Sequence, residues 1–264
     1  MGYHQDPIFK TEQGLKFPGF SLAQLSAMRK AVELEYGLIS PQLSEAASYS
    51  LAMVVRYALG LTAQDGFVGA LAGDSFAGQV ALATLRHLIN SGAQGVVLLP
   101  RPHAALSPEV EMQLKPLRRL GVRIHEFDFS ESALGGVVEV VQNCHNVMCG
   151  LHCAAGLKPS DQDLLIDALN ELSTPVHCID CPPGVDPDSG KAQGSPLYAS
   201  STLSVGAPLA GLYFGSDFVG RHYLCDMSIS AELYTANGFD ISALFAEQPV
   251  LRIMPDLIEE QSGA

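Results

Sequence analysis

Residues 67–78 decide the fold class, and they run Phe-Val-Gly-Ala-Leu-Ala-Gly-Asp-Ser-Phe-Ala-Gly. The first six residues are apolar or glycine, which is typical of a strand buried on both faces of a sheet. A Gly-Asp-Ser turn follows, and Phe76–Ile89 then has the length and pattern of a helix. A buried strand that leads directly into a helix is the unit from which parallel sheets are built.

The same unit repeats along the chain. Further strands are predicted at 95–99, 122–127, 146–150 and 175–180. Helices are predicted from Ser107-Pro108, near 134–142, and from a capping Ser160 to Leu172 with Asp163 in the capping-box position. We therefore predict an α/β protein with a Rossmann-like three-layer sandwich, in which a mostly parallel sheet carries helices on both faces.

The flanking segments are less regular. Residues 1–20 are predicted to be an N-terminal arm, because prolines and glycines break any period there. Two helices follow, one from the cap Ser21 to about Tyr36 and one from Ser40-Pro41 to near Gly60. After residue 190 the pattern favours strands at 202–205, 212–214 and 223–229. No linker or repeat interrupts residues 21–264, so we expect one domain there.

The charge balance limits the partners. The chain has 28 acidic and 15 basic residues, for a formal charge of −13. Such a surface repels phosphate backbones, so nucleic acid and anionic membrane are not expected partners. The start of the sequence is polar, and no apolar run is long enough to span a membrane. We expect a cytoplasmic protein without a signal peptide.

The turn at 73–78 is the first candidate for ligand binding. In an open α/β sheet, ligands bind outside the carboxyl ends of the strands. Gly73, Ser75 and Gly78 would let the backbone and the start of the next helix cradle a phosphate, provided that Asp74 turns away. The alternative is a tight turn in which Asp74 or Ser75 only caps the helix.

Asp180 is the candidate for proton transfer. It follows an apolar strand and precedes the turn Cys181-Pro182-Pro183-Gly184. A carboxyl group at such a position serves as a general acid or base when partial burial disfavours its charged form. The alternative is a carboxylate that caps the turn by accepting bonds from nearby amides.

A group of thiols and imidazoles is the third candidate. It includes His152, Cys149, Cys153 and Cys181. These residues would suit a thiol or metal site, but their spacing fits no zinc pattern. The alternative is that the cysteines are small buried apolar side chains.

Four stretches resemble the motifs of a known family. Residues 176–190 resemble its signature V-D-I-P-S-G-x-D-x-D-x-G, and residues 202–212 resemble T-x-x-F-G-A-P-K-x-G-L. Residues 215–229 resemble its closing G-x-x-x-x-G and D-I-G-I motifs, and Leu85-Arg86-His87-Leu88 resembles A-R-H-L. The family is the NAD(P)HX epimerases, that is, the YjeF N-terminal domain, and the resemblance covers about residues 21–230.

The resemblance implies a Rossmann-like fold, a homodimer and an isomerase that interconverts the R and S forms of hydrated NADH and NADPH. It implies that Asp180 acts on the hydrated nicotinamide and that a potassium ion helps to hold the ligand phosphate. Ligand contacts are then expected at Gly73, Asp74, Ser75 and Gly78, and in the matched motifs at Gly184, Asp186 and Gly206. The apolar stripes of the two N-terminal helices, which begin at Leu22 and Leu43, would suit the dimer interface.

Several positions depart from the family motifs. The loop G-N-N-G-G-D-G is replaced by Gly73–Gln79 without paired asparagines, and an acidic position of the family is replaced near Cys149. The turn serine is Pro183, and the lysine after G-A-P is Leu209. Of the polar set, Asp180 remains. The family potassium site, which needs oxygen ligands, is therefore expected to be lost, and no other cofactor is expected.

Three functions stay open at this point. The first, which the lost asparagines favour, is a catalytically weakened or repurposed member, a pseudoenzyme that binds a nucleotide-like ligand or a protein partner. The ligand would be an NAD(P)H hydrate or an ADP-ribose-like compound. The second is an active epimerase that uses Asp180. The third is a thiol or metal protein that uses Cys149, Cys153 and Cys181.

The altered loop leads to a prediction about potassium. Because residues 74–80 and Cys149 supply few oxygen ligands, K⁺ should not raise the melting temperature of the protein above its value in Li⁺. Thermal unfolding at equal concentrations of the two chloride salts measures this. A clear stabilisation in K⁺ alone would contradict the prediction.

Overall fold

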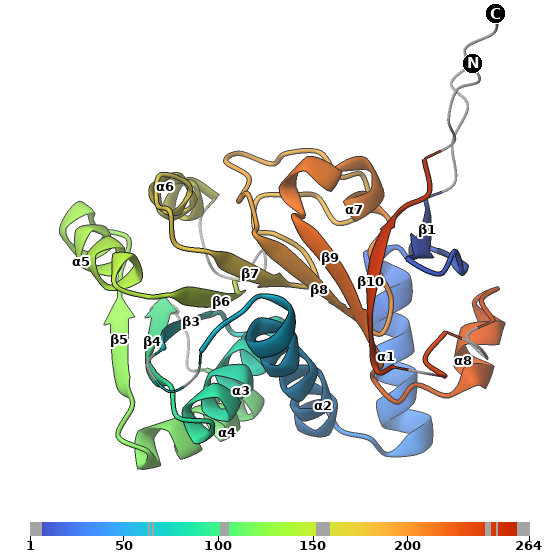
Figure 1. Cartoon of the computed structure of the whole chain (residues 1–264), viewed down its shortest axis with the longest axis horizontal. Coiled ribbons are helices and arrows are strands. Elements are labelled where there is room, and N and C mark those ends of the chain that lie inside the picture. Colours follow the sequence, from blue (N-terminus) through green and yellow to red (C-terminus); the bar gives the residue numbers. More distant parts are fainter. Residues whose placement is uncertain are drawn as a thin grey trace, which may run out of the picture.

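The strands of the central sheet are the apolar runs that the sequence places between helices. The computed structural model describes residues 7–62, 64, 66–100, 106–151, 159–240, 244–246 and 248–257. Within them, ten strands form one sheet in the order β2-β1-β10-β9-β8-β7-β6-β3-β4-β5 (Figure 1). The neighbours from β9 to β5 are parallel. Their bounds are β3 Phe67–Ala72, β4 Gln94–Pro100, β5 Arg123–Phe127, β6 Asn146–Gly150, β7 Val176–Ile179, β8 Ser201–Val205 and β9 Arg221–Cys225.

Helices cover both faces of this sheet, and the predicted three layers are confirmed (Figure 1). One face carries α1 Leu22–Tyr36, α2 Ser40–Met53, α3 Phe76–Asn90, α4 Pro108–Arg119 and α8 Ala231–Ala236. The other carries α5 Glu131–Gln142, α6 Pro159–Asn170 and α7 Gly211–Phe214. Two buried apolar clusters accompany the two faces, because strands buried on both sides need a core above and below.

The first two helices begin where their sequence signals predict. Ser21 caps α1 in a reciprocal capping box with Gln24, and Gly37 ends it with φ +70°. Helix α2 carries Pro41 in its first turn but does not continue as an α-helix to Gly60. Residues Val54–Ala58 form a wider π-helical turn, η1, in which Leu59 N–H bonds to Val54 O at 3.0 Å.

Two of the strands predicted after residue 190 are corrected. Residues 212–214 are not a strand but lie in helix α7, where the amide of Gly215 bonds to Gly211 O. Three apolar residues show no period that separates a strand from a helical turn. Strand β9 ends at Cys225 rather than at 229, because the Asp226 carboxylate accepts from Ser228 N–H at 2.8 Å and turns the chain.

The expected cap of α6 is also corrected. The helix begins at Pro159, so Ser160 lies within it rather than before it. Proline suits the first helical position because it has no amide hydrogen to satisfy. The Asp163 carboxylate instead accepts from Ser195 N–H at 2.9 Å and ties α6 to a distant loop.

The described part of the N-terminal segment pairs with the C-terminal strand. Strand β1 (Ile8–Thr11) and strand β2 (Lys16–Pro18) form a hairpin, and β1 pairs antiparallel with β10 (Val250–Pro255). The prolines and glycines that break the period of residues 1–20 lie at the ends and in the turn of this hairpin, where they are tolerated. The boundary between an arm and a domain at residue 21 stays a prediction.

The apolar stripes of the first two helices belong mainly to the core. Leu25, Met28 and Val32 of α1 are buried within the chain, as are Leu43 and Leu51 of α2. They therefore offer no surface to a second copy, and the homodimer stays a prediction that rests on the resemblance alone. Within the residues described, no helix is long and apolar enough to cross a membrane.

Buried histidines join neighbouring strands of the sheet. His177 lies between Asn146 Oδ1, 2.7 Å from its Nε2, and Ser201 Oγ, 2.8 Å from its Nδ1. His222 Nε2 lies 2.8 Å from Ser204 Oγ. Burial lowers the pKa of His177 to about 4 and that of His222 to about 3. Both rings are therefore mainly neutral in the folded protein at pH values well above 4.

Helix α3 is seated unusually close to the loops beneath it. A Cβ atom added at Gly78 would lie 1.9 Å from Gly73 O, and one added at Gly150 would lie 2.2 Å from Ala77 O. These are contacts with backbone atoms, which cannot move aside as a flexible side chain can. The two glycines are thus required where the ends of β3 and β6 meet the start of α3.

The histidines give a prediction about acid stability. In the unfolded chain a histidine protonates near pH 6.5, whereas His177 and His222 resist protonation when folded. Their stabilisation is complete above pH 6.5 and is lost as the pH falls towards 4, by up to about 1.4 kcal/mol per pH unit for each ring. The free energy of unfolding in urea between pH 7.5 and 4.5 measures this. His177→Gln should reduce the slope by about one proton, and an unchanged slope would contradict the assignment.

The glycine contacts give a second prediction. Gly78→Ala should destabilise the protein by about 1–3 kcal/mol, because the new methyl group meets backbone. Gly135→Ala is a matched control, since Gly135 lies in α5 and a Cβ added there would have no atom within 4 Å. This change should stabilise the protein by about 0.5–1 kcal/mol. If the two substitutions changed the urea midpoint equally, the contact between Gly78 and the Gly73 backbone would not be tight.

Candidate functional site

The carboxyl edge of the sheet has its topological switch point between β3 and β6. From β3 the chain continues to β4 and β5 on one side, whereas β6, β7 and β8 follow on the other side. Ligands of open α/β sheets bind at such a point, because the loops diverge and leave a crevice. The loop after β3 begins with Gly73, whose N–H bonds to Gly150 O at the end of β6 at 3.2 Å. The predicted turn at 73–78 therefore lies at the switch point.

The sequence left open whether Asp74 or Ser75 caps helix α3, and the structure shows that Ser75 does. Ser75 caps α3, with its Oγ accepting from Gly78 N–H at 3.1 Å. Asp74 instead accepts from Ser107 N–H at 3.0 Å and from Ser107 Oγ–H at 2.5 Å, and Ser107 is the residue that caps α4. Asp74 Oδ1 is therefore bonded to the start of α4 rather than to the first turn of α3.

Asp180 lies at the carboxyl end of β7, where the expected turn begins. It is 4% exposed and has φ +61°, a conformation that residues other than glycine adopt rarely. Its N–H bonds to Leu203 O at 2.8 Å, and its Oδ1 accepts from Val205 N–H at 3.1 Å. The main chain of β8 thus holds Asp180 on both its backbone and its side chain.

Arg29 is the site residue that the sequence analysis missed. Its Nη1 lies 2.8 Å from Asp180 Oδ2, and its Nη2 lies 2.9 Å from Asp180 Oδ1. The guanidinium carbon is 4.3 Å from the centroid of the Phe76 ring, which allows a cation–π contact. The available signal was a single basic residue beside the apolar stripe of α1, next to the buried Met28.

The turn that follows Asp180 is held by its own side chains. Asp186 Oδ1 accepts from both the N–H and the Oγ–H of Ser189 at 2.7 Å, and Oδ2 accepts from Gln193 Nε2 at 2.6 Å. The bonds from Ser189 lower the pKa of the Asp186 carboxyl. Gly184 has φ +77°, and a Cβ there would lie 2.1 Å from Ser195 O. These contacts give Asp186 and Gly184 structural roles, and their contact with a ligand stays a prediction.

Gly206 ends β8 beside Asp180. It has φ +85°, and its carbonyl accepts from Tyr234 Oη–H at 2.7 Å. This bond fastens α8 to the carboxyl edge. The structure therefore brings Asp180, Gly206 and the Gly73 loop to one edge of the sheet, while Asp186 stabilises the turn that follows.

The thiols gather beneath the same edge. Cys149 and Cys178 are register partners on β6 and β7, and both are buried, as is Cys181. Burial and the neighbouring Cys149 thiol raise the pKa of Cys178 well above its ordinary value. Cys153 and His152 lie outside the described residues. Within the described part of the chain, no three His, Cys, Asp or Glu side chains gather in a way that could hold a metal.

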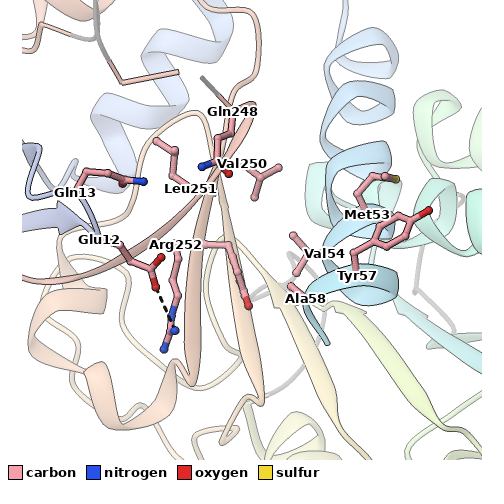
Figure 2. A pocket seen from close by; sticks show the side chains of 11 residues that line it. Glu12, Gln13, Met53, Val54, Tyr57, Ala58, Gln248, Val250, Leu251 and Arg252 are labelled. Carbon is pink, nitrogen blue, oxygen red and sulfur yellow. Dashed lines mark hydrogen bonds and ion pairs between the residues drawn. The ribbon is translucent and has the colours of Figure 1, made fainter. Parts of the chain in front are cut away.

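Two cavities lie elsewhere on the protein. A slot of about 280 Å³ separates Met53, Val54 and Tyr57 from the Val250–Arg252 strand, with the Glu12–Arg252 ion pair at one wall (Figure 2). A cavity of about 460 Å³ lies between α5 and the amino ends of β3–β5, with Arg123 and His125 in its lining. Neither lining includes Asp180 or the Gly73 loop.

Comparison with known proteins identifies relatives of this chain. An NAD(P)H-hydrate epimerase of Truepera radiovictrix is 27% identical over 245 residues, which span 89% of this chain and 100% of that protein. A bifunctional NAD(P)H-hydrate repair enzyme Nnr of Salinibacter ruber is 28% identical over 202 residues, which span 73% of this chain but 37% of that enzyme. The crystal structure of yeast ynu0 shares the fold with a TM-score of 0.76 at 17% identity, covering 89% of this chain and all of that one.

The family match covers the loops of the site at the carboxyl edge, and Arg29 lies before the matched range. Residues 40–211 match the family described as YjeF-related protein N-terminus. This range includes the Gly73 loop at the switch point, the Asp180 turn and Gly206. The chain belongs to the YjeF-related protein N-terminus family, as its motifs predict.

Proposed function

We propose that this chain binds a nucleotide-like small molecule at the carboxyl edge, of the NAD(P)H-hydrate or ADP-ribose type, and that its epimerase chemistry is weakened. The observation that carries the binding is the Gly73 loop, which lies at the switch point and whose Asp74 carboxylate is bonded to Ser107 at the start of α4. The first-turn amides of a helix attract anions, and a phosphate is the anion that such ligands carry. The names of the relatives, an NAD(P)H-hydrate epimerase and a bifunctional NAD(P)H-hydrate repair enzyme, point to the same ligand class.

The weakening rests on the state of Asp180. Arg29 contacts both of its carboxylate oxygens, and Val205 N–H donates to one of them. A general acid or base must exchange a proton with the ligand, and good candidates have an oxygen within reach of it. A carboxylate whose two oxygens already accept bonds from Arg29 and Val205 is poorly placed to exchange a proton with a ligand.

The second candidate is an active epimerase that works through Asp180. The observation in its favour is the left-handed backbone of this residue, φ +61°. Such strain costs on the order of 1–3 kcal/mol and is found most often at functional sites. A protein partner in place of the small molecule, and a homodimer, are further parts of the proposal that follow from the resemblance rather than from these contacts.

Asp180→Asn separates the two candidates. The substitution keeps shape and volume but removes the exchangeable carboxyl proton. If the chain only binds, the affinity for NADP⁺ or ADP-ribose should stay within about tenfold, or 1.4 kcal/mol. If Asp180 is the catalyst, the exchange of the two NADPH-hydrate epimers should fall by about 10²–10⁴-fold. Calorimetry measures the first quantity, and chromatography of the epimers measures the second.

Controls decide the outcome. Tyr57→Ala removes an exposed side chain in the slot of Figure 2 and should leave binding at the carboxyl edge unchanged. Lack of binding by NADP⁺, NADPH hydrate and ADP-ribose would contradict the proposed ligand class and favour a protein partner. Enzyme-dependent exchange that survives Asp180→Asn would rule out Asp180 as the catalyst.

A further inference from the structure

Arg29 joins three elements that meet at the carboxyl edge. It extends from α1, and its guanidinium contacts the Asp180 carboxylate at the end of β7. Its Nη2 also donates to Val205 O, the last carbonyl of β8, at 2.9 Å. The third element is α3, whose first residue Phe76 lies with its ring against the guanidinium. One side chain therefore links the N-terminal helix to both halves of the candidate site.

Each oxygen of the Asp180 carboxylate has a donor from the protein. Oδ2 is taken by Nη1 of Arg29, and Oδ1 is shared by Nη2 and Val205 N–H. The planar guanidinium donates one charge-assisted bond to each carboxylate oxygen, and such two-point pairs are among the strong hydrogen bonds of proteins. Three of the roughly four acceptor positions of the carboxylate are therefore taken, and a proton that came to Oδ1 would have to displace one of its two donors.

Arg29 is also prevented from moving aside. Its side chain is 19% exposed, and its Nε is buried and has no hydrogen-bond partner among the described residues. A buried donor without an acceptor is uncommon, so the position of the guanidinium is set by its other contacts rather than by Nε. The Phe76 ring, at 4.3 Å from the guanidinium carbon, restricts the side chain from the α3 side.

The other ionisable groups near the pair do not compete for Arg29. Burial raises the pKa values of Cys225 and Tyr234, so both are neutral near pH 7. The Asp226 carboxylate accepts from Ser228 N–H instead. Of the described acidic groups, Asp180 is the one in ion-pair contact with the Arg29 guanidinium.

We propose that Arg29 is a positioning residue that fixes the Asp180 carboxylate in an ion pair, and thereby withholds it from proton exchange with a ligand at this edge. The inference rests on the proposed function, because it takes that edge as the binding site. It adds a local cause for the proposed weakness of the epimerase activity, namely the Arg29 side chain, which a substitution can remove. In the wild-type protein a ligand oxygen meets a closed ion pair rather than a free carboxyl group.

Arg29→Met tests this inference, since methionine has a comparable length but no charge. Exchange of NADPH-hydrate epimers should rise at least about tenfold over the wild-type protein, a part of the 10²–10⁴-fold range for acid–base help. The gain in exchange rate should vary with pH across the range in which a carboxyl group titrates. Arg29→Lys restores a cation without the two-point contact and should give a smaller gain. Arg118→Met removes an exposed arginine from its ion pair with Glu111 on α4, and this matched control should show no gain.

The double variant Arg29→Met/Asp180→Asn should lose the gain, because the freed carboxyl group is then absent. A gain that persists in the double variant, or a folded Arg29→Met protein at the wild-type rate, would overturn the inference. If Arg29→Met does not fold, Arg29→Gln replaces it, since an amide can still bond to Val205 O. If neither variant folds, the arginine is a structural residue and the inference fails.

Calorimetric titration with NADP⁺ keeps this inference apart from the proposed function. Binding by all variants without a gain in exchange would overturn the role of Arg29 alone. Absence of binding by the wild-type protein and every variant would overturn the proposed function as well.

Discussion

A carboxylate buried at the end of β7 must be paired, and the pairing of Asp180 with Arg29 sets the arrangement of the whole carboxyl edge. Removing one partner of a buried ion pair typically costs about 3–5 kcal/mol, because the other charge stays buried. That is a large part of the roughly 5–15 kcal/mol by which domains are usually stable. The position of α1 against β7 and β8 therefore depends on this contact as well as on its apolar stripe.

The backbone of Asp180 explains why the pair forms at this residue. A φ of +61° is costly for most side chains, and aspartate tolerates it better than β-branched or bulky residues do. The bond from Asp180 N–H to Leu203 O and the bond from Val205 N–H to its side chain hold the residue in this conformation. The same conformation directs the carboxylate to Arg29. The left-handed backbone of Asp180 and its ion pair with Arg29 therefore occur together. Backbone strain alone does not establish catalysis.

Local patterns in the sequence were enough for the elements of the fold but not for the site. The strands Phe67–Ala72 and Asn146–Gly150 have the predicted bounds, because each is a continuous apolar run between turn residues. The short segment 211–214 carries no such period, and its helical bond runs from the amide of Gly215 to the carbonyl of Gly211. Arg29 and Asp180 are 151 residues apart, so no local pattern links them. A basic residue beside an apolar stripe indicates that a buried partner exists, but it does not indicate which one.

The two halves of the edge differ in what they can offer a ligand. At β3 and α3, the Asp74 side chain is bonded to Ser107, and the Ser75 side chain accepts from only one amide of the first turn, that of Gly78. At β7 and β8, the donors and acceptors of Arg29, Asp180 and Val205 largely satisfy one another. Anion binding needs donors that are not already paired, and proton transfer needs a titratable group that is not already paired. This edge therefore meets the condition for anion binding more fully than the condition for proton transfer. Membership of the family does not alter that difference, because function depends on the site rather than on the fold.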